Sequence, residues 1–154
     1  MTLHEERQQA VVAILTQLQL PVATTIRAWI EDDFSAIQEL STTQGWPSPQ
    51  SRPEESLAAW KNSWPTLVAV EAERVVGFVR AFTDGNITTY VPELLVAMDM
   101  QRRGIGRALL DACHLLYPRT RIELLSTETS QSFYTAHGFR IIGPGLRKSY
   151  VYYV

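Results

Sequence analysis

The residues best suited to chemistry form one short stretch that combines two glycines with three arginines, namely Arg102, Arg103, Gly104, Gly106 and Arg107. An apolar run precedes this stretch and apolar residues at helical spacing follow it, which predicts a strand, a glycine-bearing turn and a helix. Such a turn directs unpaired backbone N–H groups and the positive end of the helix dipole at one point, and glycine lets an anion approach the main chain closely. The pattern therefore favours binding of a phosphate or pyrophosphate.

Other interpretations of this turn require different sequence motifs. A Walker loop needs Gly, four residues and then Gly-Lys-Ser or Gly-Lys-Thr, and no such string occurs in the chain. A dinucleotide-binding fingerprint needs a third glycine where Leu109 stands, although Glu123 and Glu128 lie near the spacing of the acid that binds ribose. The pattern before residue 87 is also helices followed by consecutive strands, not repeated strand-helix-strand units. A dinucleotide site is therefore disfavoured, whereas a general phosphate site and a turn that merely opens a helix stay open.

The segment from Val96 to Gly106, Val-Ala-Met-Asp-Met-Gln-Arg-Arg-Gly-Ile-Gly, resembles the acyl-CoA-binding motif of the GNAT N-acetyltransferases. That motif reads Gln/Arg-x-x-Gly-x-Gly/Ala between a strand and a helix. A second landmark of the family, a helix that carries a tyrosine and ends in Gly-Phe, is similar to Phe133-Tyr134 followed by His137-Gly138-Phe139. The order of expected elements from Thr24 to Val154 also fits, so the resemblance covers most of the chain.

The resemblance implies an α+β fold with a mixed, mostly antiparallel central sheet of about seven strands, flanked by helices and splayed at a cofactor slot. Residues 1–154 are then a single domain, with 1–21 as an N-terminal helical extension. Pro92 lies within an expected strand and lacks an N–H group, which predicts a bulge there. The sequence pattern predicts helices near 5–19, 33–44, 53–62, 104–117 and 130–137, and strands near 24–30, 66–71, 74–82, 87–98, 121–126, 139–142 and 149–154.

Acetyl-CoA is the cosubstrate that the resemblance implies, and no metal is expected. Backbone groups at the splayed strand would pair with the pantetheine arm, and the glycine turn would hold the pyrophosphate. Thr127 stands where the family often has an asparagine, and Ser130 replaces a common alanine. The positions that correspond to cofactor-binding residues are Leu95, Val96, Ala97, Gln101, Arg102, Arg103, Gly104, Ile105, Gly106, Arg107, Thr127 and Tyr134.

Two residues are candidates for proton transfer. Tyr134 matches the family's tyrosine that hydrogen-bonds the cofactor sulfur and acts as a general acid; the alternative is a core aromatic residue beside Phe133. Glu93 lies on the strand beside the slot and is the leading candidate for the base, directly or through a water molecule. Glu71, Asp32 and Glu31 are weaker candidates for this base, and a structural ion pair is the alternative role of Glu93.

Composition limits the class of protein. The 154 residues are 45% hydrophobic and 19% charged, and a formal net charge of −2 argues against a dedicated nucleic-acid-binding protein. The single cysteine, Cys113, lies on the apolar side of the expected helix, so we expect a buried thiol in a reducing, cytoplasmic setting. No secretion signal and no membrane span are expected. The three histidines share no metal-ligand spacing.

The expected function is transfer of an acetyl group from acetyl-CoA to a primary amine of a small molecule. An acidic group (Glu31, Asp32, Asp33 and Glu93), with Trp29 and Trp46, could form a pocket for a cationic acceptor. A non-catalytic acyl-CoA-binding sensor and acetylation of a protein lysine or N-terminus are the alternatives. A homodimer is an expectation that comes from the resemblance alone.

Overall fold

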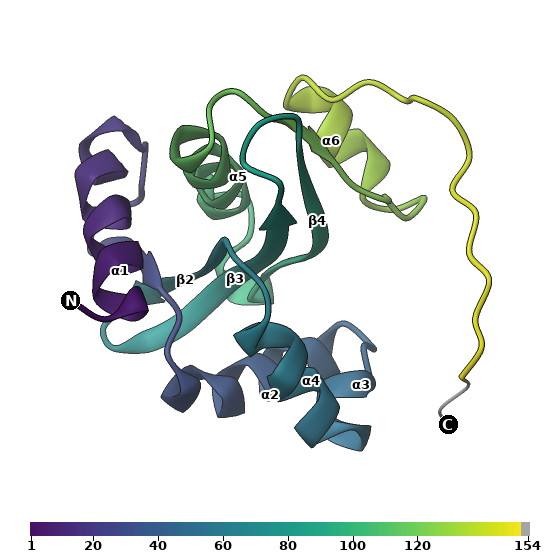
Figure 1. Ribbon diagram of the computed structural model, residues 1–154, viewed down its shortest axis with the longest axis horizontal. Coiled ribbons are helices and arrows are strands. Elements are labelled where there is room, and N and C mark those ends of the chain that lie inside the picture. Colours follow the sequence, from purple (N-terminus) through teal and green to yellow (C-terminus); the bar gives the residue numbers. More distant parts are fainter. Residues whose placement is uncertain (152–154) are drawn as a thin grey trace.

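A central sheet of five strands runs through the protein, and helices flank it (Figure 1). The structure, a computed structural model, describes residues 1–151. The strands are β1 (Thr24–Ala28), β2 (Thr66–Glu71), β3 (Arg74–Thr83), β4 (Thr88–Val96) and β5 (Arg121–Glu123). The α-helices are α1 (Leu3–Ile14), α2 (Phe34–Thr43), α3 (Ser48–Ser51), α4 (Pro53–Lys61), α5 (Ile105–Leu116) and α6 (Gln131–Ala136), and the 3₁₀ helices are η1 (Leu15–Gln17), η2 (Glu31–Asp33) and η3 (Met98–Met100).

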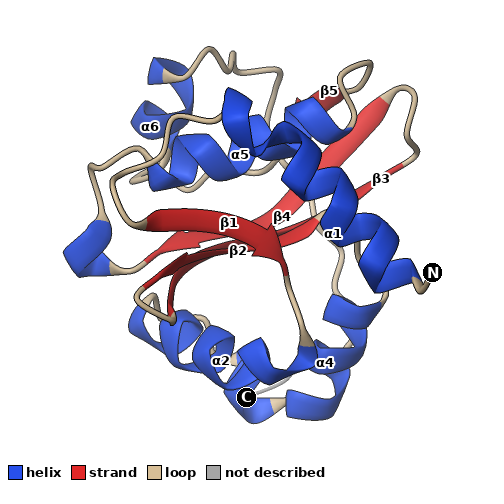
Figure 2. Cartoon of the chain, turned by 90° about the vertical axis from the view of Figure 1, so that its left-hand side faces the viewer, coloured by secondary structure: helices blue, strands red, loops and turns tan. Residues whose placement is uncertain are grey.

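The strands lie in the order β1-β2-β3-β4-β5, and only the last pair is parallel. This confirms the mixed, mostly antiparallel sheet. Helices cover both faces: α1, α5 and α6 lie on one side of the sheet, and α2 and α4 lie on the other (Figure 2). The predicted arrangement, a central sheet flanked by helices, is therefore confirmed.

Two hydrophobic cores hold these layers together. On one face, α1 and α5 bury Val11, Ile105 and Leu109 against the sheet. On the other face, α2 and α4 bury Ile37 and Trp60 in a second core. Both cores use the three-to-four-residue spacing that gives a helix one apolar side. The sheet is thus fixed from both faces where it leads into the glycine turn.

The predicted bulge at Pro92 is present. Arg80 pairs with Glu93, but Phe82 pairs with Tyr90, so the register of β3 against β4 shifts by one residue between these pairs. Two residues of β4 therefore oppose one residue of β3. A proline at the bulge avoids the loss of a ladder hydrogen bond, because the bulged residue is left unpaired.

The sheet is splayed between β4 and β5, as the resemblance implied. The parallel pairing joins Thr88–Tyr90 of β4 only to Arg121–Glu123 of β5. After Tyr90, β4 continues to Val96 along an edge that β5 does not cover. This leaves a gap in the sheet directly before the glycine turn.

The prediction of about seven strands was too high, since residues 1–151 contain five. Residues 139–142 form no strand, and neither do residues 149–151; residues 152–154, the end of the last predicted strand, lie outside the described residues. The apolar, β-branched pattern at residues 139–142 was sufficient for a prediction, but a strand forms only beside a partner. β5, three residues long, pairs with β4 and with no other strand of the described chain.

Candidate functional site

The open edge of β4 presents alternate backbone groups to the gap. In an antiparallel pair, successive residues direct their N–H and C=O groups alternately toward and away from the partner strand. The N–H of Ala97 donates to the carbonyl of Val76 on β3, with an N···O distance of 2.8 Å. Leu95, two residues earlier, therefore also faces β3. The polar groups of Leu94 and Val96 face the gap instead.

This alternation changes the predicted set of backbone groups. The carbonyl of Leu95 lies 3.0 Å from the position that a Cβ on Gly77 would take, and the carbonyl of Ala97 accepts the N–H of Met100 at 2.9 Å. Neither Leu95 nor Ala97 offers these groups to the gap. The backbone groups of Val96 face the gap, and so do those of Leu94, which was not among the proposed positions. Counting back from Val96 in steps of two would have found it, because every second residue of a strand faces the same neighbour.

The glycine turn ends in a helix with free N–H groups. Gly104 adopts a left-handed conformation with φ +86° at the N-cap of α5, and Arg102 is also left-handed with φ +66°. The N–H of Ala108 makes the first α-helical bond, to the carbonyl of Gly104. The N–H groups of residues 105–107 precede it and have no helical partner. They add to the positive end of the dipole of a helix whose first turn holds no acidic residue.

The arginines differ in how they are placed. Arg102 and Arg107 line a cavity in front of this helix end, whereas Arg103 is exposed beside it. The Nε atom of Arg107 lies 3.7 Å from the Oδ2 atom of Asp111, and both side chains are mostly exposed. An exposed pair at this distance is weak. The guanidinium of Arg107 is therefore free to turn toward an anion at the helix end.

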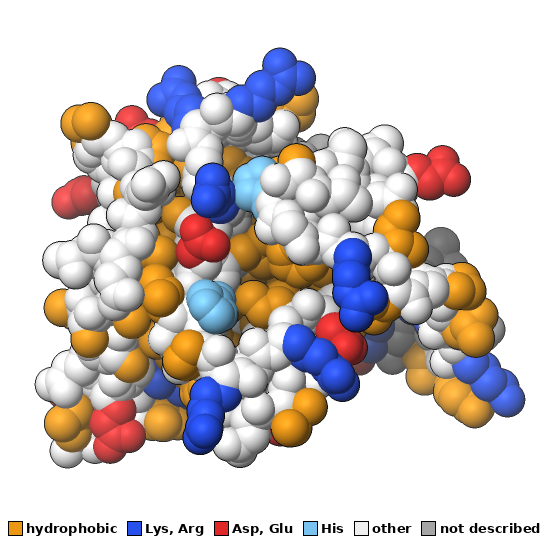
Figure 3. All heavy atoms as spheres, turned by 90° about the horizontal axis from the view of Figure 1, so that it is seen from above, with side chains coloured by type: hydrophobic (Ala, Val, Ile, Leu, Met, Phe, Trp, Pro, Cys, Tyr) orange, Lys and Arg blue, Asp and Glu red, His pale blue; other side chains and the backbone are white. Residues whose placement is uncertain are grey.

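The cavity has a volume of about 720 Å³ and lies between β4, the glycine turn and α6. Its volume is in the range of ligand pockets, roughly 300–1,000 Å³. The molecular face that carries α5 and α6 is hollowed, with hydrophobic side chains in the hollow and charged side chains around it (Figure 3). The lining residues include Gln44, Leu94, Val96, Gln101, Arg102, Gly104, Gly106, Arg107, Thr129, Ser130, Phe133 and Tyr134. We call this the cofactor cavity below.

Two contacts fix the wall around Val96 and Gly106. The side-chain amide of Gln101 donates to the carbonyl oxygen of Val96 at 3.1 Å, so this carbonyl points into the cofactor cavity. A Cβ on Gly106 would lie 3.2 Å from the Cζ atom of Phe133. A side chain at position 106 would therefore require the Phe133 ring to shift by a few tenths of an ångström. The spacing of the glycines in the sequence does not indicate that Gly106 contacts Phe133.

Tyr134, the candidate for the acid, lines the cofactor cavity from α6. Its ring packs edge-on against Phe133 and Phe139, with centroid distances of 5.1 Å and 5.4 Å. Burial raises the pKa of the Tyr134 phenol above its ordinary value. The hydroxyl therefore stays protonated at neutral pH, as a proton donor must.

Thr127 is placed differently from its prediction. Its hydroxyl accepts the N–H of Ser130 at 3.2 Å and lies 3.1 Å from the Thr129 hydroxyl, so the side chain closes the turn before α6. Thr129 and Ser130 line the cofactor cavity, and Thr127 does not. A short hydroxyl side chain bonds its own turn readily, which accounts for the difference.

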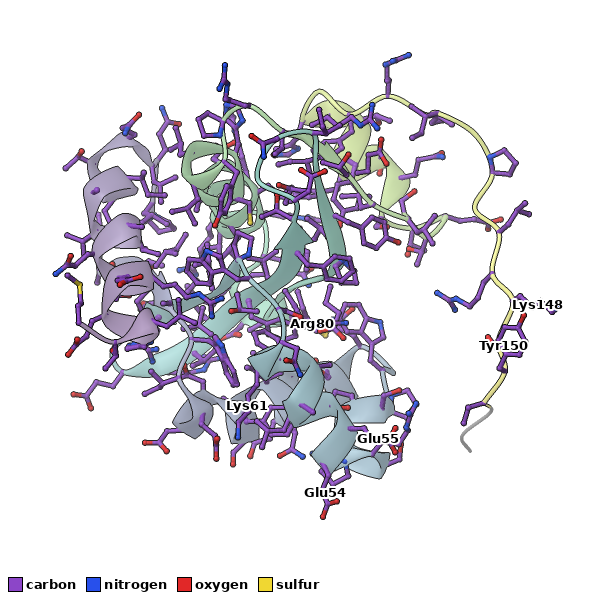
Figure 4. The ribbon with its side chains drawn as sticks, viewed as in Figure 1. Glu54, Glu55, Lys61, Arg80, Lys148 and Tyr150 are labelled. Carbon is purple, nitrogen blue, oxygen red and sulfur yellow. The ribbon has the colours of Figure 1, made fainter. Side chains whose placement is uncertain are left out.

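Glu93 lies on β4 beside the cofactor cavity but on the face that carries α2 and α4. Its Oε2 atom accepts a hydrogen bond from Nε of Arg80 at 3.1 Å, and both side chains are largely buried. Arg80 lies near the centre of the molecule (Figure 4) and also donates to the Ser63 hydroxyl at 3.3 Å. The ion pair named as the alternative role therefore exists. It engages one carboxylate oxygen of Glu93.

The other acidic residues do not gather around Glu93. Asp33 is buried and forms a two-pronged ion pair with Arg27, at 2.8 Å and 2.9 Å, while Glu31 pairs with Lys61 at 2.7 Å. The predicted acidic acceptor pocket is therefore not formed as one cluster. The side chains of the β1–α2 region find local cationic partners instead.

Within residues 1–151, no three His, Cys, Asp or Glu side chains are placed to hold a metal ion together. The same part of the chain contains no helix with the length and apolar character needed to cross a bilayer. Cys113 is fully buried, as predicted, and burial raises the pKa of its thiol to about 12. It therefore takes no part in the cavity.

Comparison with known sequences identifies one family. A sequence model of the acetyltransferase (GNAT) domain matches residues 62–141, which is just over half of the chain. This match spans the bulged strand, the glycine turn and α6. A comparison with curated protein sequences gave no match.

Comparison with solved structures gives the same fold. The crystal structure of an acetyltransferase from Deinococcus radiodurans R1 aligns with this chain with a TM-score of 0.69 and 22% sequence identity. The alignment covers 86% of this chain and 94% of that one. A GNAT family acetyltransferase from Streptococcus pneumoniae TIGR4 has a TM-score of 0.67 and 23% identity, covering 82% and 96%. An aminoglycoside acetyltransferase from an uncultured soil metagenomic sample has a TM-score of 0.67 and 16% identity, covering 88% and 100%.

Proposed function

Because this chain belongs to the GNAT acetyltransferase family, we propose that it transfers an acetyl group from acetyl-CoA directly to a primary amine of a small molecule. One observation carries the proposal. The cofactor cavity joins the free N–H groups of α5, the open edge of β4 and the Tyr134 side chain in a single space. These are three different kinds of group, and a CoA thioester has a matching part for each.

The fit of the cofactor follows from the donors and acceptors available. The pyrophosphate would lie at the N-terminus of α5, where the N–H groups of residues 105–107, Arg102 and Arg107 favour an anion. The amides of the pantetheine arm would pair with Leu94 and Val96, as an added strand pairs with a sheet edge. Gln101 would release the carbonyl of Val96 in exchange for that pairing. The thioester then lies toward Tyr134.

Direct transfer needs two proton movements. The amine nitrogen attacks the thioester carbon, a C–N bond forms and the C–S bond breaks. Glu93 takes the proton that the nitrogen loses, directly or through water, and Tyr134 gives a proton to the departing thiolate. The free Oε1 side of the Glu93 carboxylate serves as the acceptor, while Arg80 holds Oε2. Burial of Tyr134 keeps its proton available for that step.

The acceptor class is supported by one structural relative. An aminoglycoside carries several primary amines, and a structurally similar protein is an aminoglycoside acetyltransferase. A test panel should therefore contain aminoglycosides, diamines and amino acids beside a lysine peptide and a free peptide N-terminus. Turnover only with the peptides would favour the protein-acetylating alternative. Cofactor binding without turnover would favour the sensor.

Release of CoA thiol, measured with a disulfide reagent, tests the proposal. Cys113 does not interfere, because it is fully buried and protonated. We expect thiol release that depends on a small amine and on Tyr134. Release at the same rate without any amine would mean hydrolysis and would contradict amine transfer.

A further inference from the structure

Arg7 is a charged residue on the packing side of α1. The buried residues of this helix are Val11 and Ile14, and Arg7 lies four residues before Val11, on the same side of the helix. The helix is held against the sheet because the side chain of Gln8 accepts the N–H of Ala28, at the end of β1, at 2.8 Å. Arg7 is therefore partly buried between α1 and the body of the protein.

The guanidinium of Arg7 has an aromatic neighbour but no acidic one. Its Cζ atom lies 4.7 Å from the centroid of the Trp64 ring, a distance typical of a cation–π contact. Burial lowers the pKa of Arg7, and among the described residues only Tyr117 acts in the opposite direction. Within residues 1–151, no ion pair or hydrogen bond joins Arg7 to a carboxylate. Trp64 covers one face of the guanidinium, so the N–H groups at its edge are left without a protein acceptor.

Arg7 lines a cavity that lies outside the site described above. This cavity has a volume of about 320 Å³, within the range of ligand pockets, and lies between the start of α1, the end of β1 and the end of α4. Its lining includes Arg7, Trp29, Ile30, Glu31, Lys61 and Trp64. None of its lining residues lines the cofactor cavity, and β2 and β3 lie between β1 and β4. We call it the α1 cavity.

One positive charge in the α1 cavity is not neutralised. The Nζ atom of Lys61, at the end of α4 (Figure 4), lies 2.7 Å from the Oε1 atom of Glu31, so these two charges balance each other. Arg7 has no such partner within the described chain. A carboxylate suits a guanidinium best, because its two oxygens accept two parallel N–H bonds. The charge of the α1 cavity therefore favours an organic acid over an amine.

Two tryptophan rings supply the apolar part of the same cavity. Trp29 follows β1 and Trp64 precedes β2, and each of them also packs against one of the two hydrophobic cores. Trp29 is supported by Trp60, with ring centroids 5.2 Å apart. Rings that are already fixed lose little conformational freedom when a ligand binds. They are therefore suited to contact a flat apolar group.

We propose that the α1 cavity is a binding site for a small carboxylate that carries a flat apolar group, of which an aromatic acid is the simplest example. The carboxylate pairs with the free edge of the Arg7 guanidinium, and the flat group lies against the tryptophan rings. Three strand spacings, about 14 Å, separate β1 from β4. The site therefore does not depend on acetyl-CoA, and it stands or falls independently of the proposed acetyl transfer.

Four probes separate the contribution of the charge from that of the ring. Benzoate has both, benzamide is its neutral analogue, benzamidine is its cationic analogue, and acetate lacks the ring. In NMR titrations of the full chain, we expect benzoate to bind about tenfold or more tightly than benzamide, since hydrogen bonds between charged groups are the strong ones. Benzamidine and acetate should also bind more weakly than benzoate. Equal affinity for benzoate and benzamide would overturn the proposal.

The NMR signals also locate the probe. Benzoate should shift the indole N–H signals of Trp29 and Trp64 and leave that of Trp46, which lies between α2 and α3, in place. The N-terminus of α5 is a second site at which a carboxylate could bind. Shifts of the backbone N–H signals of residues 104–107 without shifts at the two tryptophans would therefore contradict the proposal.

Variants of Arg7 test its role against that of a purely structural residue. Arg7→Gln and Arg7→Met both remove the guanidinium, and methionine keeps an unbranched apolar side chain beside Trp64. Both variants should bind benzoate no more tightly than benzamide. Arg119→Gln is the control, because Arg119 is an exposed arginine that does not line the α1 cavity, and this variant should keep the preference for benzoate.

Thermal unfolding completes the test. We expect neither Arg7 variant to lower the melting temperature appreciably, because the charge that is removed is partly buried and has no carboxylate partner in the described chain. A lower melting temperature together with an unchanged preference for benzoate would mean that Arg7 only supports Trp64, and would overturn the proposed site. Loss of the preference in Arg119→Gln as well would also contradict it.

Discussion

Among the residues of the anion site, Gly104 is the one at which we expect a single substitution to have the clearest effect. Its φ of +86° lies in the left-handed region, and nothing lies within 4 Å of the position that a Cβ would take. Gly104→Ala therefore causes no collision, and its effect comes from the backbone alone. A left-handed conformation costs a residue with a Cβ about 1–2 kcal/mol relative to glycine.

This cost must lower either the stability of the free protein or its affinity for acetyl-CoA. If the turn keeps its shape in the free protein, the folded state loses about 1–2 kcal/mol, and the melting temperature falls by about 2–8 °C for a domain of this size. If the turn relaxes, binding must restore the strained shape that aims the N–H groups of residues 105–107. The dissociation constant for acetyl-CoA then rises about 5–30-fold for the same free energy.

Gly106→Ala is the matched comparison, because it adds the same methyl group two residues later. Gly106 lies inside α5, where alanine favours the helix by up to about 1 kcal/mol. Its Cβ would, however, lie 3.2 Å from Phe133, so Phe133, which precedes Tyr134 on α6, must move by a few tenths of an ångström. We expect little loss of stability and a lower turnover number.

Calorimetric titration with acetyl-CoA and thermal unfolding of both variants give the needed numbers. The stability loss and the binding loss of Gly104→Ala should add to about 1–2 kcal/mol. An unchanged melting temperature together with unchanged affinity would refute the role assigned to this turn.

Three further outcomes are expected. Tyr134→Phe should lower kcat by about a hundredfold or more while leaving the affinity for acetyl-CoA nearly unchanged, since a general acid contributes about 10²–10⁴-fold; Tyr117→Phe, at the end of α5, should leave both unchanged. Glu93→Gln should lower kcat by a similar factor, whereas Glu31→Gln should leave kcat unchanged. In steady-state assays of thiol release, a larger loss of kcat for Glu31→Gln than for Glu93→Gln would identify Glu31 as the base instead. Burial raises the pKa of Cys113 to about 12, so its thiolate is negligible at about pH 8. A disulfide reagent should therefore label no thiol in the folded protein at about pH 8 and one thiol after denaturation.

Local patterns were enough to predict most of the fold. The apolar spacing of Ile105, Leu109 and Cys113 identified α5 and its buried side, and all three residues are buried in the structure. Pro92 identified the bulge because proline cannot complete a ladder. Both inferences use only the geometry of one element and its nearest neighbours.

Features that depend on distant parts of the chain were less predictable. The strands expected at residues 139–142 and 149–154 have strand-forming sequences, but their pairing depends on what lies beside β5. Thr127 lies at the expected position, yet its hydroxyl bonds to Ser130 instead of facing the cavity. The contact between Gly106 and Phe133 joins two helices that are far apart in sequence, and no local signal indicates it.

The same limit applies to Glu93. Its place beside the slot followed from the strand that carries it. Its partner Arg80 lies on the neighbouring strand, and their pairing depends on the register shift at the bulge. A register cannot be read from either strand alone, because a shift of one residue moves every side chain to the other face.

Calorimetric titration of the purified protein with acetyl-CoA, NAD and ATP tests the central claim most directly. All three ligands carry phosphates that suit the N-terminus of α5, but only acetyl-CoA has an arm that can pair with the open edge of β4. The predicted result is one acetyl-CoA bound per chain and much weaker binding of NAD and ATP. Equal binding of all three ligands would reduce the site to a general phosphate site, and no binding of acetyl-CoA would contradict the acetyltransferase account.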